Sequence, residues 1–125
     1  DVVAVTFDLQ ASGFFSGSVL ENATVTATGN GTARDNGSST ANGGGAFIVA
    51  TTVSGSTPSL TAKITHSADD VTYADLVTFT ALTSAGAEVK EIASGTTINR
   101  YLKVVYTVSG TTPSFSVIVG LGRNN

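Results

Sequence analysis

The chain has 125 residues, of which 41% are hydrophobic and only 12% are charged, and its net charge at pH 7 is −3. This length makes one domain with its own core, and the absence of Cys excludes a disulfide framework, a thiolate metal site and a cysteine nucleophile. The acidic balance offers no basic surface for nucleic acid, and no apolar run reaches the roughly 18 residues of a membrane-spanning helix. We therefore expect a weakly charged β-protein that binds neither nucleic acid nor membrane.

The chain opens with a strand-like alternation over residues 2–9, followed by an apolar pair between small residues. No signal-peptide pattern precedes the alternation, so we expect that a leader has been removed or that further residues lie upstream. Residues 1–20 are predicted to form an N-terminal strand segment, and residues 21–125 the main domain. The apolar residues that we single out in this segment are Val3, Val5, Phe7, Leu9, Phe14 and Phe15.

The rest of the sequence shows strand periodicity and no helical periodicity over three turns. A strand is predicted at 23–28. Residues 29–45 are predicted to be a surface loop, because they are rich in Gly and Asn and contain no aromatic residue, Leu, Ile or Val. Asn36-Gly37 predicts a tight turn within this loop. Six further strands are predicted at about 46–54, 59–66, 74–80, 87–92, 98–109 and 114–122.

Apolar and polar residues alternate along these strands, as in a half-buried sheet. Many short strands with turn signals between them indicate an all-β fold, an antiparallel β-sandwich of the Ig-like or jelly-roll type with about 7–8 strands. The alternating apolar residues are Leu60, Ala62 and Ile64 in one strand, and Phe115, Val117, Val119 and Leu121 in another.

An octapeptide occurs twice, at residues 53–60 and 108–115, with six of eight positions identical at a spacing of 55. Both prolines of the chain, Pro58 and Pro113, lie in it. Since Pro cannot donate to a central strand ladder, both copies are predicted to be hairpin turns. Recurrent turn chemistry is the favoured interpretation, and a binding loop used twice is the alternative.

His66 is the only histidine, so one chain cannot build a multi-histidine metal site. Ser67 and Asp69 formally complete a Ser-His-Asp set, but neighbouring residues of a strand point to opposite faces. We expect His66 to be a structural residue at a strand end. We expect no catalytic residue, no enzymatic activity and no cofactor.

Asp69, Asp70 and Asp75 form the only acidic cluster and are the candidates for a metal site. Three carboxylates can contribute to a Ca²⁺ site, but such a site needs six or more oxygens, and the Asp-x-Asp-x-Asp-Gly spacing is absent. The favoured interpretation is a polar turn in which Asp69-Asp70 caps a chain reversal, without a metal.

Arg100 lies near the start of the longest predicted strand, 98–109, and we expect it to pair with an acidic residue at a sandwich edge or across a subunit contact. Asn22, Asn30 and Asn36 each begin a glycosylation acceptor pattern, which arises readily by chance in so Thr- and Asn-rich a sequence. The chain has no Trp and three Tyr, so it offers few planar rings for a sugar-binding platform.

The sequence between residues 29 and 122 resembles a β-sandwich module of tailed-bacteriophage structural proteins, in particular the C-terminal domain of siphophage major tail proteins. Residues 6–13 are similar to the last strand of the tail-tube barrel. The matching text is Gly29-Asn30-Gly31-Thr32, Asp35-Asn36-Gly37, Ala41-Asn42-Gly43-Gly44, His66-Ser67-Ala68-Asp69, Thr72-Tyr73-Ala74-Asp75-Leu76, Asn99-Arg100-Tyr101-Leu102, the paired Ser-Gly-x-Thr-Pro-Ser segments and Gly122-Arg123.

The resemblance implies a non-enzymatic virion structural protein: the surface-exposed domain of a major tail or tail tube protein in a multi-copy symmetric assembly. It implies copies of the same chain and other virion proteins as partners, and a location in the virion, which assembles in the host cytoplasm. The N-terminal apolar residues and Arg100 are then the interface candidates. Two alternatives stay open, a capsid decoration protein on the head surface and a carbohydrate- or host-surface-binding β-sandwich module with weak host-glycan contact.

Overall fold

The computed structural model describes the backbone of residues 4–9 and 13–124 and the side chains of residues 19–124. Every regular element in these residues is a β-strand, and the strands pair antiparallel, which confirms the predicted all-β sandwich. No helix in this part of the chain could cross a membrane. The strands are β1 (Ala4–Leu9), β2 (Gly13–Val25), β3 (Gly29–Asn30), β4 (Arg34–Asp35), β5 (Gly44–Ser67), β6 (Ala74–Thr78), β7 (Gly86–Ile92) and β8 (Tyr101–Arg123).

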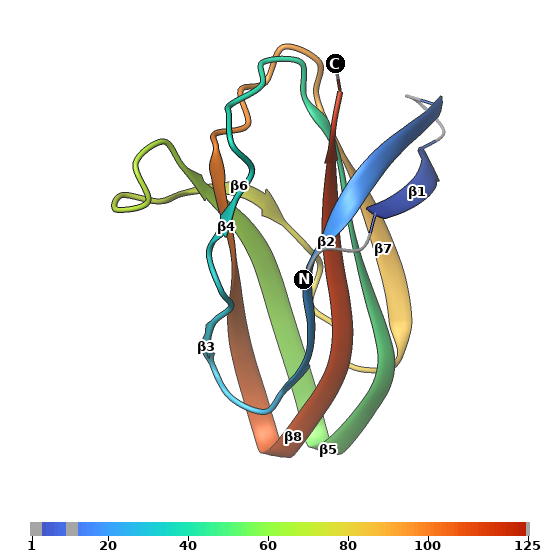
Figure 1. The fold of residues 1–125 in the computed structure, drawn as a ribbon. Coiled ribbons are helices and arrows are strands. Elements are labelled where there is room, and N and C mark those ends of the chain that lie inside the picture. The colour runs from blue at the N-terminus through green and yellow to red at the C-terminus, as the bar shows by residue number, and fades with distance from the viewer. Residues whose placement is uncertain (1–3, 10–12, 125) are drawn as a thin grey trace.

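Two long strands, β5 and β8, pair along their whole length and bend together halfway, so that one sheet folds into two layers (Figure 1). Layer A consists of β1, β2 and β7 with residues 44–54 of β5 and 114–123 of β8. Layer B consists of β3, β4 and β6 with residues 59–67 of β5 and 101–109 of β8. The two layers are therefore covalently continuous through both long strands.

The core lies between the layers and is aliphatic with a few aromatic rings. Full burial of such side chains contributes about 1.5–3 kcal/mol each, before conformational entropy is counted. The residues predicted from the alternation are confirmed as core residues, each at most 3% exposed: Leu60, Ala62, Ile64, Phe115, Val117, Val119 and Leu121.

The bend is made by the two copies of the repeated octapeptide, which pair with each other. Ser56 lies opposite Thr111, and the ladder skips the residues around this pair, Pro58 and Pro113 among them. The skipped residues form one bulge in each strand, and the two bulges are related by the 55-residue repeat. Because a bulged residue needs no ladder hydrogen bond, proline is tolerated there in the middle of a strand.

The backbone of the two copies is nearly identical. Gly55 and Gly110 have φ angles of 112° and 110°, and Thr57 and Thr112 both have a φ of 47°. A Cβ atom on Gly55 would lie 2.7 Å from the carbonyl oxygen of Thr112, and one on Gly110 would lie 2.7 Å from that of Thr57. Each glycine therefore allows both the positive φ and the close approach of the other copy.

The prediction that the two copies are hairpin turns is wrong. The strands predicted at 46–54 and 59–66 are the single strand β5, and those predicted at 98–109 and 114–122 are the single strand β8. The paired bulges accommodate the prolines that suggested chain reversals.

The predicted loop at 29–45 is irregular over most of its length, but it contains β3 and β4, and it ends early. Gly44 and Gly45 are buried residues that begin β5 and pair with β7 and β8. The strand predicted at 23–28 overlaps only the last three residues of β2, which ends at Val25.

β1 lies at one end of the strand order and pairs with β2. Pairing of β2 with β8 begins at Gly17, so residues 13–16 and β1 form a hairpin that extends past the paired part of layer A (Figure 1). The domain boundary placed at residue 20 lies inside β2, and the division of the chain there remains a prediction.

Candidate functional site

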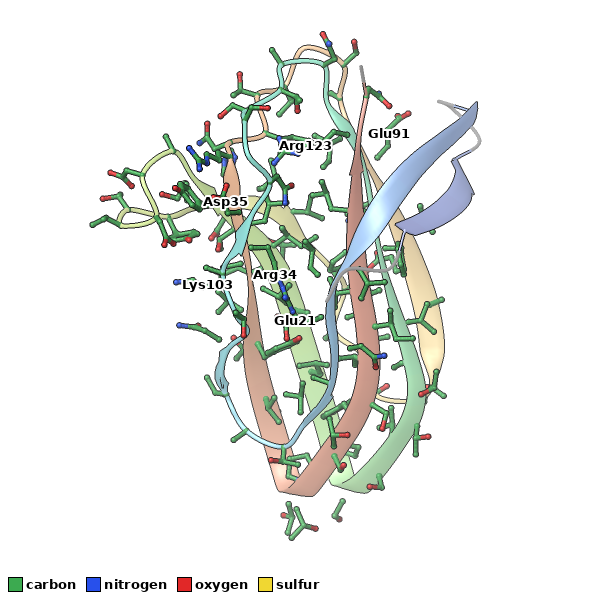
Figure 2. All side chains as sticks on the ribbon, viewed as in Figure 1. Glu21, Arg34, Asp35, Glu91, Lys103 and Arg123 are labelled. Atoms are coloured by element: carbon green, nitrogen blue, oxygen red, sulfur yellow. The ribbon has the colours of Figure 1, made fainter. Side chains whose placement is uncertain are left out.

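The polar side chains with the most contacts gather at the end of the sandwich opposite the bend, around Arg123 (Figure 2). Its Nε and Nη2 donate to Oδ1 of Asn36 at 3.1 and 2.9 Å, and Nη1 donates to Thr40 Oγ1 at 3.0 Å. Nη1 and Nη2 also donate to the carbonyl oxygens of Ile98 and Asn99, both at 2.6 Å. These described partners are neutral, and burial lowers the pKa of Arg123. The guanidinium ties β8 to two loops.

Arg100 forms a two-pronged ion pair at the same end of the molecule. Its Nε and Nη2 donate to the two carboxylate oxygens of Asp35 at 2.6 and 2.8 Å, and its guanidinium lies 5.0 Å from the Tyr101 ring centroid. The Arg100 bond, together with the N–H of Gly37 at 2.8 Å, lowers the pKa of Asp35 to about 2. Arg100 thus has an acidic partner in its own chain, and its role at an interface remains a prediction.

His66 is held as a neutral acceptor. Its Nδ1 accepts the N–H of Asn99 at 3.1 Å, and burial together with the charge of Arg123 lowers its pKa. The Ser67 hydroxyl donates to Asp69 at 2.9 Å, and not to His66. The three residues of the formal Ser-His-Asp set are therefore not arranged as a relay.

Asp69 organises the turn between β5 and β6. Its Oδ1 accepts the N–H groups of Val71 and Thr72, both at 3.0 Å, while the Ser67 oxygen accepts those of Asp69 and Asp70 at 3.2 and 2.9 Å. The N–H groups of Thr72 and Val71 are the main cause of the lowered pKa of Asp69. The polar turn predicted here is present, with Asp69 as its capping residue.

The other two acidic residues of the cluster have separate partners. Asp70 accepts the hydroxyl of Tyr73, whose pKa rises to about 12 through burial and this bond. Lys103 Nζ lies 4.1 Å from the Tyr73 ring centroid, and Asp75 pairs with Lys63 at 2.9 Å. Within the described residues, no group of three acidic or histidine side chains is placed to hold a metal ion.

A cleft of about 280 Å³ opens where the chain crosses from β2 in layer A to β3 in layer B. Glu21 lines it at 8% exposure, accepts the N–H of Thr32 at 3.0 Å and lies 3.8 Å from Arg34, its neighbour in Figure 2. Tyr106, 4% exposed, also lines it. The Tyr106 hydroxyl has no hydrogen-bond partner among the described residues, and burial raises its pKa.

The N-terminal interface candidates fall where the structure describes no side chains. Val3 lies outside the described residues altogether, and five others lie in strands whose backbone alone is described: Val5, Phe7, Leu9, Phe14 and Phe15. Their assignment to an interface remains a prediction.

Sequence reasoning missed Arg123, Glu21 and Tyr106. One signal pointed to Arg123: it is the first charged residue after Lys103, at the end of a long uncharged run. A charge so isolated usually marks a specific contact, because nothing nearby in sequence can pair with it. Glu21 and Tyr106 gave no comparable signal, because their burial follows from the bulge in β2 and the path of the β2–β3 connection.

No protein-family model matches the chain, and no curated protein matches it. Among solved structures, the CBM22-1–GH10 modules of xylanase 10B from Clostridium thermocellum align with 100% of this chain and 25% of theirs, at 9% identity and a TM-score of 0.46. This chain thus spans about a quarter of that protein.

Two further structures are similar at the same level. The CBM36-1 domain of a multidomain xylanase from the hindgut metagenome of Trinervitermes trinervoides aligns over 100% of this chain and 99% of its own, at 9% identity and a TM-score of 0.43. Infectious bursal disease virus, Gx strain, aligns over 97% of this chain and 29% of its own, at 18% identity and a TM-score of 0.39. All three TM-scores are below 0.5, and nothing about function is inferred from them.

Proposed function

We propose that this chain is a non-enzymatic structural module of a bacteriophage virion, the surface-exposed domain of a major tail or tail tube protein that is repeated in a symmetric assembly. The motif resemblance over residues 29–122 supports the family. The observation that carries the proposal is the position of β1 at the free end of the strand order.

β1 shares residues 6–9 with the segment, residues 6–13, that resembles the last strand of a tube barrel. A strand that belongs to an upstream barrel or to a neighbouring copy needs a free edge for pairing. β1 has β2 on one side only in the described pairing, and the hairpin extends past the rest of layer A. Its sequence between Ala4 and Leu9 contains one charged residue, Asp8, and no Lys, Arg or Pro, so little in it discourages edge pairing.

The use of the polar groups supports a structural role over a catalytic one. The hydrogen bonds that the structure shows for His66, Arg100, Arg123 and the turn at Asp69 are all made to groups of this domain. An active site needs a nucleophile, acid or base that is free to meet a substrate.

The outer face of layer A carries apolar side chains: Val49 and Ile118, which lie opposite each other and are half-buried, and Val89, which is 48% exposed. Glu91, two residues from Val89 on the same strand, is exposed as well. This face therefore offers both apolar and charged groups for a contact with another protein.

Two functions remain as alternatives to a tail protein. A capsid decoration protein would use the same sandwich on the head. A carbohydrate- or host-surface-binding module is favoured by one feature, the cleft lined by Glu21 and Tyr106, whose buried hydroxyl lacks a partner among the described residues. A sugar hydroxyl can donate to a carboxylate and accept from a phenol. Tight calorimetric binding of one sugar, lost in Glu21→Gln, would favour this alternative over the virion role.

Immunogold electron microscopy tests the proposal. Antibodies raised against the purified chain are applied to particles of the virus that encodes it, with antibodies preabsorbed on the chain as the control. Label along the tail is expected. Label on the head would replace the tail assignment with capsid decoration, and particles without label, intact or disrupted, would contradict a virion role.

A further inference from the structure

The chain contains three Asn-Gly dipeptides, at residues 30–31, 36–37 and 42–43. In such a pair the backbone nitrogen of the glycine can approach the side-chain carbonyl of the asparagine, because glycine has no Cβ in the way. The three pairs share this local chemistry and differ in their surroundings, so they form an internal comparison.

The N–H of the glycine has a different kind of partner at the middle pair. The N–H groups of Gly31 and Gly43 donate to main-chain carbonyl oxygens of neighbouring segments, at 2.7 and 3.0 Å. The N–H of Gly37 donates instead to a carboxylate oxygen of Asp35 at 2.8 Å. A carboxylate can accept the proton of that nitrogen more readily than a carbonyl oxygen can. Arg100 pairs with both oxygens of this carboxylate and lowers the pKa of Asp35 to about 2, which limits how strongly Asp35 acts as a base.

The side-chain carbonyl of Asn36 is also unlike that of the other two. Nε and Nη2 of Arg123 both donate to Asn36 Oδ1, at 3.1 and 2.9 Å. Two donors from a cation polarise the carbonyl and are placed to stabilise negative charge that develops on its oxygen. Asn36 is exposed, so water reaches the site.

We propose that Asn36 is a self-modification site at which the chain converts its own asparagine to a carboxylate. The Gly37 nitrogen gives its proton to Asp35 and bonds to Cγ of Asn36, while Arg123 holds the oxyanion. The bond from Cγ to the side-chain nitrogen then breaks, and ammonia leaves with the proton returned by Asp35. Water opens the resulting succinimide ring, which leaves aspartate or isoaspartate at position 36.

The product fits its surroundings better than the asparagine does. Arg123 is partly buried, and its described partners are neutral amide, hydroxyl and carbonyl groups. In the aspartate product, a carboxylate in place of the Asn36 amide supplies the opposite charge at hydrogen-bond distance, and charge-assisted bonds are stronger than neutral ones. In the isoaspartate product the main chain runs through that carbon, so only the aspartate product gains this bond. Conversion to aspartate would therefore fasten the loop after β4 to the end of β8. This inference is independent of the virion proposal.

Peptide mapping by mass spectrometry during incubation of the full chain at pH 8 tests the site. Conversion at Asn36 is expected to be about a hundredfold faster than at Asn30 and Asn42, because Asp35 and Arg123 each contribute about tenfold, less than such groups contribute in an enzyme active site. Equal rates at the three asparagines would overturn the proposal.

Variants test whether Asp35 and Arg123 promote the conversion of Asn36 or whether exposure of the loop is sufficient. Asp35→Asn and Arg123→Gln are each expected to slow conversion at Asn36 about tenfold and to leave Asn30 and Asn42 unchanged. Arg100→Gln is the matched variant, since it removes the ion pair but keeps the Asp35 carboxylate; the pKa of Asp35 then rises towards its ordinary value, and conversion at Asn36 should become faster. Should Arg123→Gln fail to fold, Asp35→Asn decides: faster conversion in that variant, as a loosened loop would give, overturns the proposal.

Discussion

The two ends of the sandwich have a similar composition and are held together in different ways. At the bend, two copies of a Ser-, Thr-, Gly- and Pro-containing octapeptide pack backbone against backbone, without a charged residue in either copy. At the other end, loops of similar residues are fastened by Arg123 and Arg100, which reach partners 24 to 87 residues away. Small polar residues thus set chain geometry at one end and serve as ligands for arginine at the other. Neither use requires an external ligand.

The largest effect is expected at the bend. Gly110→Ala places a Cβ 2.7 Å from the Thr57 carbonyl oxygen at a φ of 110°, so we expect a loss of at least about 2 kcal/mol of unfolding free energy. Gly55→Ala should lose as much, because the two copies are equivalent. Gly29→Ala is the control, with nothing within 4 Å. Urea denaturation measures the unfolding free energy of all three variants. A loss in only one of the two bend variants would show that the two octapeptide copies are not equivalent.

The next largest effect is expected at the loop end. Arg123→Met removes five hydrogen bonds to two loops, three of them partly buried, for a loss of about 2 kcal/mol. Arg123→Lys keeps the charge but cannot serve the same acceptors with one ammonium, so it should recover less than half of the loss. Full stability in Arg123→Lys would show that the positive charge alone stabilises the loop end of the sandwich.

A pH effect should follow from His66. Its folded pKa is lowered by burial and by Arg123, so the unfolded chain, with a His pKa near 6.5, binds more protons as the pH falls. Stability should therefore decline as the pH drops below about 6.5. His66→Asn, which keeps an acceptor for the Asn99 N–H, should be flat between pH 7 and 5 by urea denaturation. The same slope in both chains would assign the effect to another group.

The smallest effect is expected for the Asp35–Arg100 pair. Both side chains are exposed, at 47% and 43%, so solvent and salt screen their attraction. Asp35→Asn should lower the melting temperature slightly at low ionic strength, and 1 M salt should abolish the difference. A large loss of melting temperature that persists in 1 M salt would show that this ion pair, like Arg123, contributes strongly to the stability of this end of the sandwich.

The core of the fold was predictable from sequence because it depends on local alternation. Leu60, Ala62 and Ile64 face inward with the period of two that their spacing indicates. The continuity of β5 and β8 was not predictable in the same way. Pro58 and Pro113 read locally as strand breakers, and only the pairing of one copy with the other turns each into part of a bulge.

The polar sites show the same limit. The turn at Asp69 was predictable, since all its partners lie within three residues. The contacts of Arg123 join segments up to 87 residues apart, so no local pattern could identify them. The isolation of Arg123 from other charged residues is evident in the sequence, but the residues that it contacts are not.

The virion proposal holds that this chain works by assembly and not by chemistry. Quantitative mass spectrometry of gradient-purified particles tests it, with the number of copies per particle as the measured quantity. We expect the chain to be as abundant as the major structural proteins of the tail or the head, at a constant ratio across independent preparations. Absence from the particles, or a trace amount that falls with each purification step, would contradict the proposal.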